Sequence, residues 1–585
     1  MRNTTWKHIG LMAVLTLLFF VRPSTDASAR RMSPVSPSQG EPSFLYALQD
    51  DERCRQWVDS VMHTLSLKER VGQLFVYTIA PTQTKANVEL LRKVVKHYKV
   101  GGLLFSAGSV PSQVALTNLA QEWADVPLMI TLDGEWGLAM RLKDTPEFPR
   151  NMVLGCVRND SLLYEYGREV ARECREMGIH VNFAPVADVN INPDNPVINS
   201  RSFGEDPAEV ARKVVAYARG LEDGGVLSVG KHFPGHGDTN VDSHKALPTL
   251  RFTRQRLDSV ELYPFRRMIE AGLNGIMVGH LAVPEIEGAE NVPASLSRRV
   301  AHDLLAGELG FKGLVFTDAL AMKGVQGEGS VCLRALQAGN DLLLVPRRIK
   351  EEVEAVVHAV RHGQLSREDI DRRCRKVLTY KYALGLRSKP YVRLSGLTTR
   401  LNTPYVRDLV SRLKLAAITV LDNKNETLPL DPTLKDVAVL EVGGGTDLTP
   451  LMQELSIFVD PVKFDVARGM DATRQAALKK KLAGYRRIVV CVTDEQWADY
   501  QSFFEGGLPD GVPVVYALFV QGHKLDEKLQ HDLTQASAVV LAHSTDEDVQ
   551  RRTVDILYGS ADADGRLSAS IGNLYAAGSG LQMSR

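Results

Sequence analysis

The sequence predicts an α/β protein in which a (β/α)8 TIM-like barrel is followed by a three-layer α/β/α sandwich domain, and three observations lead to this fold class. Short apolar runs alternate with amphipathic helical patterns eight times over roughly 300 residues, as β/α units do. Polar clusters come directly after several of these runs, as at the C-terminal face of a barrel. A second alternating series begins near residue 405, after a linker. A doubly wound open sheet is the alternative for the first series, but eight units favour closure.

The predicted barrel strands are short apolar runs of the length that buried parallel strands have. They span residues 71–77, 100–105, 128–132, 181–185, 227–230, 275–279, 313–317 and 341–345. Amphipathic helical patterns lie between them, for example at residues 88–98, 162–177, 208–221 and 298–309. We therefore expect the barrel domain to cover residues 43–387, with a long helical segment at its end.

A linker that contains Pro, Gly and Thr is predicted at residues 388–404, and the sandwich domain follows at 405–585. Its predicted strands, which favour a largely parallel sheet, are residues 418–421, 437–442, 487–492, 512–519 and 538–542. Three glycines at 443–445 follow one of these strands. Because Leu448 stands where the last glycine of a dinucleotide-binding motif would be, these glycines indicate a βα turn and no nucleotide site.

Residues 1–29 have the pattern of a secretory signal peptide. Arg2 and Lys7 give a positive start, residues 9–21 an apolar centre, and residues 27–29 a small-residue cleavage site, Ala-Ser-Ala. The Ser- and Pro-rich residues 30–42 are predicted to be a flexible leader. We therefore expect export to the periplasm or the extracellular space, with no stable membrane span after signal removal. A retained N-terminal anchor is the alternative.

The overall composition is that of a soluble globular protein. Hydrophobic residues make up 44% and charged residues 24% of the 585 residues. Lys plus Arg equals Asp plus Glu at 70 each, which disfavours nucleic acid as a partner. The six cysteines are scattered without a Cys-x-x-Cys pair, so we expect buried thiols and no structural zinc.

Chemically active side chains are concentrated at residues 231–244, directly after the apolar run at 225–230. This stretch reads Lys-His-Phe-Pro-Gly-His-Gly at 231–237 and Asp-Ser-His at 242–244. Charged and imidazole groups just past a strand are where barrel enzymes keep their active sites. Asp242 and His244 can pair within one turn, so that the carboxylate orients the imidazole and raises its basicity.

This motif resembles the signature of the family three glycoside hydrolases, in their β-N-acetylglucosaminidase branch. The resemblance covers nearly everything after the leader, including the chain's ending at 554–567, and is most specific in the barrel. It implies an exported, exo-acting, retaining β-N-acetylglucosaminidase, with Asp318 as the nucleophile and His244 as the acid/base, paired with Asp242. The alternatives are a helix N-cap for Asp318 and a loop-stabilising role for His244.

The same resemblance implies a sugar-binding shell around these groups. Asp133 and Arg141 are expected to hold hydroxyls on the non-reducing side of the sugar. Lys231 and His232 are expected to bind adjacent hydroxyls, and Arg201 to help position the ring. The physical reason is that charged donors and acceptors make the stronger hydrogen bonds to hydroxyls.

Several neighbouring residues have open roles. The sequence Trp-Gly-Leu-Ala-Met at 136–140 departs from the Gly-Gly-Arg pattern common in cytoplasmic relatives, and Trp136 is either a core residue or a stacking surface. Asp188 and His280 end predicted strands at the same face, where structural support is the alternative to binding. His236 is expected to shape its loop.

No cofactor and no metal is predicted, because retention with two protein groups needs none. The expected partner is a GlcNAc-terminated glycan, such as a peptidoglycan fragment or a chitin oligomer, and the oligomeric state stays open. One rival is a β-glucosidase or β-xylosidase of the same family, whose branches usually lack the Asp-Ser-His element; another is a catalytically silent carbohydrate-binding protein. Because a deprotonated imidazole is neutral, phosphate as the glycosyl acceptor is a secondary hypothesis.

Overall fold

The computed structural model describes residue 45 and residues 51–243, 246–325, 328–525 and 527–584. The predicted signal peptide and leader lie outside these residues, and so does His244. The described residues all belong to one compact unit. We refer to residues 52–383 as the N-terminal region and to residues 404–584 as the C-terminal region.

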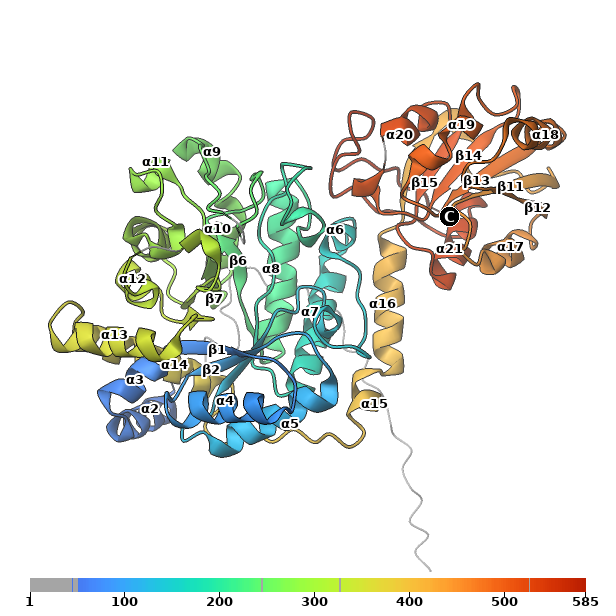
Figure 1. Ribbon diagram of the computed structural model, residues 1–585. Coiled ribbons are helices and arrows are strands. Elements are labelled where there is room, and N and C mark those ends of the chain that lie inside the picture. Colours follow the sequence, from blue (N-terminus) through green and yellow to red (C-terminus); the bar gives the residue numbers. More distant parts are fainter. Residues whose placement is uncertain (1–44, 46–50, 244–245, 326–327, 526, 585) are drawn as a thin grey trace, which may run out of the picture. The chain divides into compact units, whose positions relative to one another are not determined.

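The N-terminal region is an α/β structure whose parallel strands form two hydrogen-bonded sheets (Figure 1). The larger sheet has the strand order β5-β4-β3-β2-β1-β9, and the smaller one the order β6-β7-β8. Isolated parallel bridges pair Val186 with Lys231 and Phe316 with Leu342, so both outer strands of the smaller sheet contact segments that adjoin the larger one. The strands are β1 (Phe75–Ile79), β2 (Gly102–Phe105), β3 (Met129–Leu132), β4 (Val181–Asn182), β5 (Leu227–Ser228), β6 (Gly230–Phe233), β7 (Gly275–Val278), β8 (Leu314–Thr317) and β9 (Leu343–Leu344).

Capping groups explain where helices of this region begin. α8 (Pro207–Asp223) starts at Asp206, whose carboxylate accepts from two backbone N–H groups, and it has proline in its first turn. α3 (Leu67–Gly72) starts with a capping box between Ser66 and Glu69. The other helices are α2 (Glu52–Thr64), α4 (Lys85–Lys96), α5 (Val110–Trp123), α6 (Asn151–Leu154), α7 (Asp160–Glu176), α9 (Arg254–Ser259), α10 (Tyr263–Glu270), α11 (Pro284–Glu287), α12 (Val331–Ala338), α13 (Ile349–Arg361) and α14 (Arg367–Ala383).

Two sequence predictions need correction in detail. The strand predicted at 71–77 begins only at Phe75, because Val71 is a buried residue near the end of α3. Periodicity alone does not distinguish a short apolar helix end from a strand. The helix predicted at 298–309 is present as η4 (Arg299–Glu308), which is a π-helix. The short turns η1 (Leu138–Met140), η2 (Asn199–Arg201), η3 (Ala294–Leu296) and η5 (Lys323–Val325) complete this region.

Helices α7 and α8 pack together and support the segment that follows β3. Tyr166 of α7 stacks on Tyr217 of α8, with ring centroids 4.6 Å apart and the planes 8° from parallel. The Tyr217 hydroxyl donates to the carbonyl of Gly134 at 3.3 Å, and the Tyr166 hydroxyl to the carbonyl of Glu135 at 3.4 Å. This buried pair therefore fixes the backbone at the C-terminal end of β3.

The C-terminal region carries a sheet of order β10-β15-β14-β13-β11-β12, in which β10 is antiparallel to β15 and the other pairs are parallel. Alternate residues of β11 pack into two separate apolar clusters, so both faces of the sheet are covered. The strands are β10 (Thr419–Asn423), β11 (Asp436–Val442), β12 (Asp460–Val466), β13 (Arg487–Val492), β14 (Val514–Leu518) and β15 (Ala538–Leu541). The helices and turns are α16 (Pro404–Ala416), η6 (Lys424–Glu426), α17 (Thr449–Leu455), α18 (Ala472–Leu482), η7 (Trp497–Asp499), α19 (Gln501–Phe504), η8 (Gly522–Lys524), α20 (Glu527–Leu533) and α21 (Glu547–Leu557). One short helix, α15 (Leu397–Leu401), precedes this region.

Two general expectations can be compared with these elements. The six cysteines are free thiols and all of them are buried, as the sequence predicts. Within the described residues, we find no helix that combines the length and the apolar character needed to cross a membrane.

Candidate active site

A cavity of about 290 Å³ opens at the C-terminal ends of the strands in the N-terminal region. Apolar side chains from four strands or strand ends line it: Leu104, Phe183, Met277, Leu344 and Val345. The polar and charged lining residues are Asp133, Glu135, Arg141, Arg201, Lys231, His232, Ser243 and Asp318. The structure thus brings all five predicted sugar-binding residues and the predicted nucleophile to one cavity.

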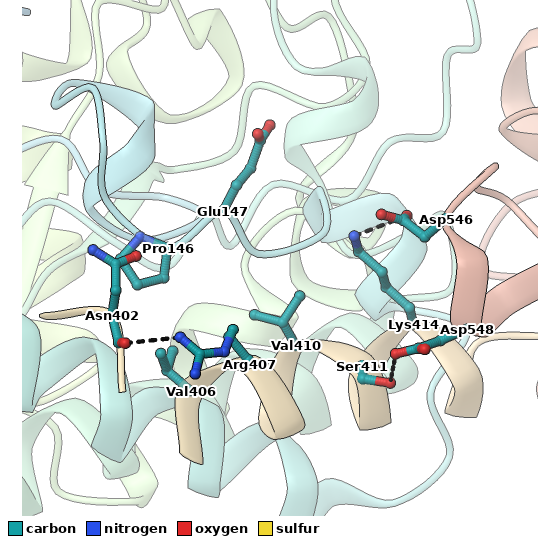
Figure 2. A pocket seen from close by; sticks show the side chains of 10 residues that line it. All are labelled: Pro146, Glu147, Asn402, Val406, Arg407, Val410, Ser411, Lys414, Asp546 and Asp548. Atoms are coloured by element: carbon teal, nitrogen blue, oxygen red, sulfur yellow. Dashed lines mark hydrogen bonds and ion pairs between the residues drawn. The ribbon is translucent and has the colours of Figure 1, made fainter. Parts of the chain in front are cut away.

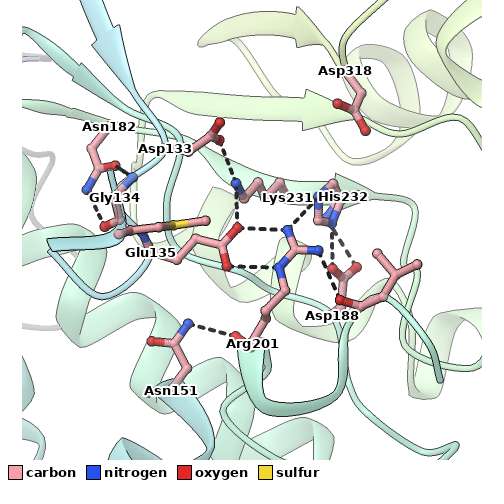
Figure 3. Close-up of polar contacts among 12 residues, drawn as sticks. Asp133, Gly134, Glu135, Asn151, Asn182, Asp188, Arg201, Lys231, His232 and Asp318 are labelled. Carbon is pink, nitrogen blue, oxygen red and sulfur yellow. Dashed lines mark hydrogen bonds and ion pairs between the residues drawn. The ribbon is translucent and has the colours of Figure 1, made fainter. Parts of the chain in front are cut away.

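Asp133 follows β3 directly and accepts hydrogen bonds from two cations. Figure 3 draws its contact with Lys231, in which Oδ1 accepts from Nζ. This N–O distance is 3.0 Å, and Oδ2 lies 3.0 Å from Arg141 Nη2. Burial opposes the charge on Asp133, but Lys231 and Arg141 more than offset this effect and lower its pKa below the usual value. Because Asp133 and Arg141 keep 23% and 32% of their side-chain surface exposed, both can reach a ligand.

Glu135 is a central residue of the site that the sequence analysis did not single out. It is fully buried, and its two carboxylate oxygens accept from Nε and Nη2 of Arg201 at 2.9 and 2.7 Å (Figure 3). Lys231 Nζ lies 2.8 Å from Oε1 of the same carboxylate. Burial disfavours the charged form, yet Arg201 and Lys231 lower the pKa of Glu135 far below its ordinary range. The one feature of the sequence that indicates Glu135 is its place as a second acidic residue, two positions after Asp133.

His232 is oriented by Asp188, which is completely buried. Asp188 Oδ2 lies 2.7 Å from His232 Nδ1, and Asp188 Oδ1 accepts from the backbone N–H groups of His232 at 3.1 Å and His236 at 2.7 Å. The other ring nitrogen of His232 lies 3.4 Å from Arg201 Nη2. Of the two roles left open for Asp188, the structure therefore shows the supporting one: its carboxylate sets the direction of His232.

Asp318 follows β8 and lines the cavity. Its backbone N–H donates to the carbonyl of Val278 at 2.9 Å, and its Oδ1 accepts from the N–H of Ala319 at 2.6 Å. Burial opposes its charge, but the imidazoles of His280 and His232 and the Ala319 N–H lower its pKa to about 2. The next helical turn after Asp318, η5, begins only at Lys323, so this carboxylate does not cap a helix directly behind it.

His280 supports the segment that follows Asp318. Its Nε2 lies 3.1 Å from the carbonyl oxygen of Ala319, and its Nδ1 lies 2.8 Å from the Ser295 hydroxyl. The imidazole is completely buried. This arrangement matches the structural alternative for His280 and holds the backbone next to Asp318.

The loop that starts at Lys231 returns to the cavity at its far end. Asp242 is half-buried there, and Ser243 is buried and lines the cavity. His244, the predicted acid/base, lies outside the described residues. Ser243, the immediate neighbour of His244, therefore lies beside the cavity, and the position of the imidazole itself stays a prediction.

Two further residues named from the sequence now have defined surroundings. Trp136 is buried, and the guanidinium of Arg150 lies 3.6 Å from its ring centroid. Because Trp136 does not line the cavity, it is a core residue here and not a stacking surface. His236 shapes its loop as expected: its Nδ1 lies 2.8 Å from the Thr239 hydroxyl, and its carbonyl accepts from Asn195 at 2.8 Å.

Comparison with known proteins identifies the family. Residues 66–380, more than half of the chain, match the model described as the glycosyl hydrolase family 3 N-terminal domain. The chain belongs to glycosyl hydrolase family 3. The matched range contains every residue that lines the cavity.

Two family 3 relatives show how far the sequence similarity reaches. Beta-hexosaminidase A of Pseudoalteromonas piscicida is 32% identical over 375 residues, which cover 58% of this chain and 62% of that protein. Beta-hexosaminidase LpqI of Mycobacterium tuberculosis is 34% identical over 334 residues, which cover 54% of this chain and 83% of that protein. The chain therefore spans less than two thirds of the first of these relatives.

Two solved structures resemble both regions of the chain. A β-N-acetylglucosaminidase from Paenibacillus sp. str. FPU-7 has a TM-score of 0.68 and 32% identity, over 87% of this chain and 99% of that one. The beta-glucoside phosphorylase BglX has a TM-score of 0.73 at 21% identity, over 89% of this chain and 97% of that one. At such low identity, the second similarity concerns the fold alone.

A second hollow, of about 220 Å³, lies along α16 (Figure 2). Several of its polar side chains contact neighbours: Lys414 Nζ lies 2.8 Å from Asp546, the Ser411 hydroxyl donates to Asp548 at 2.6 Å, and Arg407 donates to a backbone carbonyl at 3.0 Å. None of the predicted site residues lines it. The predicted site residues that the structure describes at a cavity lie instead at the strand ends.

Proposed function

We propose that this family 3 chain is a retaining, exo-acting β-N-acetylglucosaminidase that removes terminal β-linked GlcNAc from glycans. The observation that carries the proposal is the convergence of Asp318, Lys231, His232 and Ser243 on one cavity. These residues come from three separate segments of the chain, and two of the segments carry the motif that resembles the β-N-acetylglucosaminidase branch. The names of the two hexosaminidase relatives and of the Paenibacillus enzyme support the same substrate class.

The nucleophile in this proposal is Asp318. A nucleophilic carboxylate must be ionised at working pH, and a pKa of about 2 keeps Asp318 ionised at neutral pH. Its place at a strand end and its hydrogen bond from Ala319 hold one oxygen while the other can attack the sugar. Attack at the anomeric carbon would give a covalent glycosyl-enzyme, which water then hydrolyses with net retention.

The acid/base in this proposal is His244, paired with Asp242. An imidazole whose ordinary pKa lies near the working pH can protonate the leaving oxygen and then deprotonate the attacking water. The support is the sequence motif together with the placement of Ser243, the immediate neighbour of His244, in the cavity lining. The loop from Lys231 to Ser243 thus connects the sugar-binding lysine to the proposed proton donor.

The charged side chains opposite Asp318 are proposed to bind the sugar. A neutral sugar presents hydroxyls that both donate and accept, and the cavity offers matching groups of both kinds. Asp133 supplies an acceptor, whereas Arg141, Lys231 and Arg201 supply donors. Because each of these cations already pairs with Asp133 or Glu135, a sugar can bind without leaving a buried charge unpaired.

We also propose the finer architecture that the sequence predicts. The two parallel bridges between the sheets of the N-terminal region support closure into a (β/α)8 barrel over residues 43–387. The apolar clusters on both faces of the C-terminal sheet support a three-layer sandwich over residues 405–585. Limited proteolysis with mass spectrometry tests the linker at 388–404, where the first cut is expected.

Export is proposed from the signal pattern of residues 1–29. Expression in a host with its native leader, followed by mass spectrometry of the N-terminus, tests this proposal. A mature chain that starts at Arg30 in the periplasm or the medium supports export. An intact Met1 on protein that stays inside the cell contradicts it.

The enzymatic proposal is tested with chromogenic β-glycosides of GlcNAc, glucose and xylose, compared side by side. We expect fast release of p-nitrophenol from the GlcNAc glycoside, loss of nearly all turnover in Asp318→Asn, and a decrease of about 10²–10⁴-fold in His244→Ala. Proton NMR of the first product should show the β anomer, because the mechanism retains configuration. Faster cleavage of the glucose or xylose glycoside would assign the chain to another branch, and sugar binding without cleavage would indicate a silent binding protein.

A further inference from the structure

The loop at residues 199–205 carries Arg201 and also contacts Asp188, the residue that orients His232. Arg201, at its start, makes the paired contact with Glu135. One residue later, the Ser202 hydroxyl donates to the carbonyl of Asp188 at 2.6 Å, and Asp188 in turn holds His232. A displacement of this loop would therefore move a guanidinium and an imidazole of the cavity at the same time.

The outer side of this loop contacts the C-terminal region, at a segment formed by residues 566–570. The backbone N–H of Glu205 donates to the carbonyl of Ser568 at 3.0 Å. In the opposite direction, the N–H of Ser570 donates to Glu205 Oε2 at 3.1 Å, and the Ser570 hydroxyl donates to Glu205 Oε1. These partners are separated by more than 360 positions along the chain, which makes this contact one of the longest-range contacts near the cavity.

The same segment also holds α6, the helix beneath Arg201. The Ser568 hydroxyl donates to the carbonyl of Met152 at 2.6 Å, and the N–H of Arg566 donates to the carbonyl of Cys156 at 3.0 Å. Asn151, the first residue of α6, donates to the carbonyl of Arg201 at 2.7 Å (Figure 3). The 566–570 segment thus reaches Arg201 by two routes, through Glu205 and through α6.

The fit between loop and segment is close enough to require glycine. Gly204 has φ of +151°, and a Cβ added to it would lie 2.4 Å from the carbonyl oxygen of Ser568. On its other side, the segment is anchored in the C-terminal region: Leu567 belongs to an apolar cluster there, and Ala577 donates from its N–H to the Ser570 hydroxyl at 3.0 Å. The contact therefore joins the loop to the core of the C-terminal region.

We propose that residues 566–570 are a positioning element for sugar binding, which holds the 199–205 loop so that Arg201 and Asp188 face the cavity correctly. This gives the C-terminal region a part in substrate binding, although none of its described residues lines the cavity. The inference rests on the proposed function, because it names what holds the sugar-binding group of that same site. Ser570 and Glu205 act through Arg201 and Asp188, so they are positioning residues.

The test combines two measurements on the full chain with Ser570→Ala, which removes the hydroxyl donor to Glu205. Hydrogen–deuterium exchange read by mass spectrometry should show faster exchange in peptides that cover residues 199–206. On p-nitrophenyl β-GlcNAc, KM should rise about five- to tenfold, the equivalent of one lost hydrogen bond to a charged group, while kcat changes less than about twofold. Glu205→Gln, on the other side of the contact, should reproduce both changes.

Matched variants make the outcome decisive. Ser570→Thr keeps the hydroxyl and should restore native exchange and KM. Ser502→Ala removes an exposed hydroxyl of the C-terminal region that accepts from Gln475 at 3.0 Å, and it should leave both unchanged. The inference is overturned if Ser570→Ala and Glu205→Gln both keep native exchange at 199–206 and a native KM. It is also overturned if exchange increases evenly over the whole chain. If the native protein cleaves none of the glycosides, the proposed function fails, whereas the exchange measurement still decides whether the 566–570 segment holds the loop.

Discussion

The guanidinium of Arg201 and the carboxylate of Glu135 form a two-pronged ion pair at the edge of the cavity, with N–O distances of 2.9 and 2.7 Å. Glu135 is completely buried, so it does not offer its charge to solvent. The buried Glu135 carboxylate contacts both Arg201 and Lys231. It therefore stabilises the charged forms of these two side chains and fixes their directions. Glu135 thus organises the donors that the sequence motif supplies.

The first prediction concerns this pair. Glu135→Gln leaves Arg201 and Lys231 beside a neutral amide, so the free energy of unfolding should fall by about 3 kcal/mol. The value of kcat/KM on a GlcNAc glycoside should fall by about tenfold or more, because the donors lose their alignment. Thermal unfolding and steady-state kinetics measure the two effects. The control is Glu147→Gln, an exposed acid in the second hollow, which should behave as the native protein.

The second prediction concerns Asp188 and His232. In Asp188→Asn, the amide NH₂ can face His232 Nδ1, so that Nδ1 has to accept a hydrogen bond. The proton of the neutral ring then lies on Nε2, which faces Arg201. Losing a hydrogen bond to a charged group should lower kcat/KM by about 10- to 100-fold, mainly through KM. The exposed Asp194→Asn serves as the matched control. An unchanged KM in Asp188→Asn would show that the orientation of His232 does not matter for binding.

Much of the fold follows from local patterns, and the exceptions have physical reasons. Buried parallel strands such as β13 are continuous apolar runs, so they can be recognised without any long-range information. β12 is not predicted, because it pairs with β11 at the sheet edge and exposes most of its side chains, including Lys463 and Asp465. Its stability comes from pairing with β11 and not from its own composition.

The site was predictable to the extent that its residues stand in one motif or at strand ends. Lys231, His232 and Asp318 stand at strand ends, which is a local signal, and the resemblance to the family 3 motif implied their roles. The role of Glu135 depends on Arg201, 66 positions away, and that of Ser570 on Glu205, 365 positions away. Such pairings depend on how the chain packs, so only the structure reveals them.

The third prediction uses Glu173, a buried acid in α7. Neither of its carboxylate oxygens has a hydrogen-bond partner among the described residues. Burial and the charge of Glu169 raise the pKa of Glu173 well above 4.5, although Arg172 acts in the opposite direction. Because the folded-state pKa of Glu173 is raised, the contribution of this group to stability is fully present below pH 4.5, the ordinary pKa of a glutamic acid. This contribution is lost as pH rises through the folded-state pKa.

Glu173→Gln removes this titration while it keeps the shape of the side chain. The variant should therefore melt higher than the native protein at pH 7.5, by the order of a few degrees, and the difference should shrink toward pH 4.5. Differential scanning calorimetry at both pH values measures this. Glu169→Gln is the contrasting variant, because Glu169 is paired with Arg172 at 2.6 Å and its loss should lower the melting temperature at pH 7.5. A Glu173→Gln variant that is less stable at pH 7.5 would mean that the native carboxyl has a partner.

The last prediction concerns acid sensitivity and His180, a buried residue before β4. The Nδ1 atom of His180 accepts from the backbone N–H of Ile130 at 3.2 Å, so this nitrogen cannot hold a proton in the folded state. Burial, followed by the charges of Lys381 and Arg175, lowers its pKa to about 3. Because the folded-state pKa lies below the unfolded value of 6.5, the stability contributed by the neutral ring is complete above pH 6.5 and is lost as pH falls toward 3.

His180→Asn tests this assignment, because the Asn Oδ1 can accept from Ile130 N–H in place of Nδ1 but does not titrate. The variant should melt somewhat lower than the native protein at pH 7.5, since it loses ring packing, yet it should lose less stability between pH 7 and pH 4.5. Melting curves over this range measure the slope for both proteins. Parallel slopes would mean that other groups, such as the buried His236 with a pKa lowered by burial to about 4, account for the acid sensitivity instead. A shallower slope in His180→Asn ties part of the loss of stability in acid to the residue that precedes β4. Because His180 does not line the cavity, such a result separates acid unfolding from the pH dependence of catalysis.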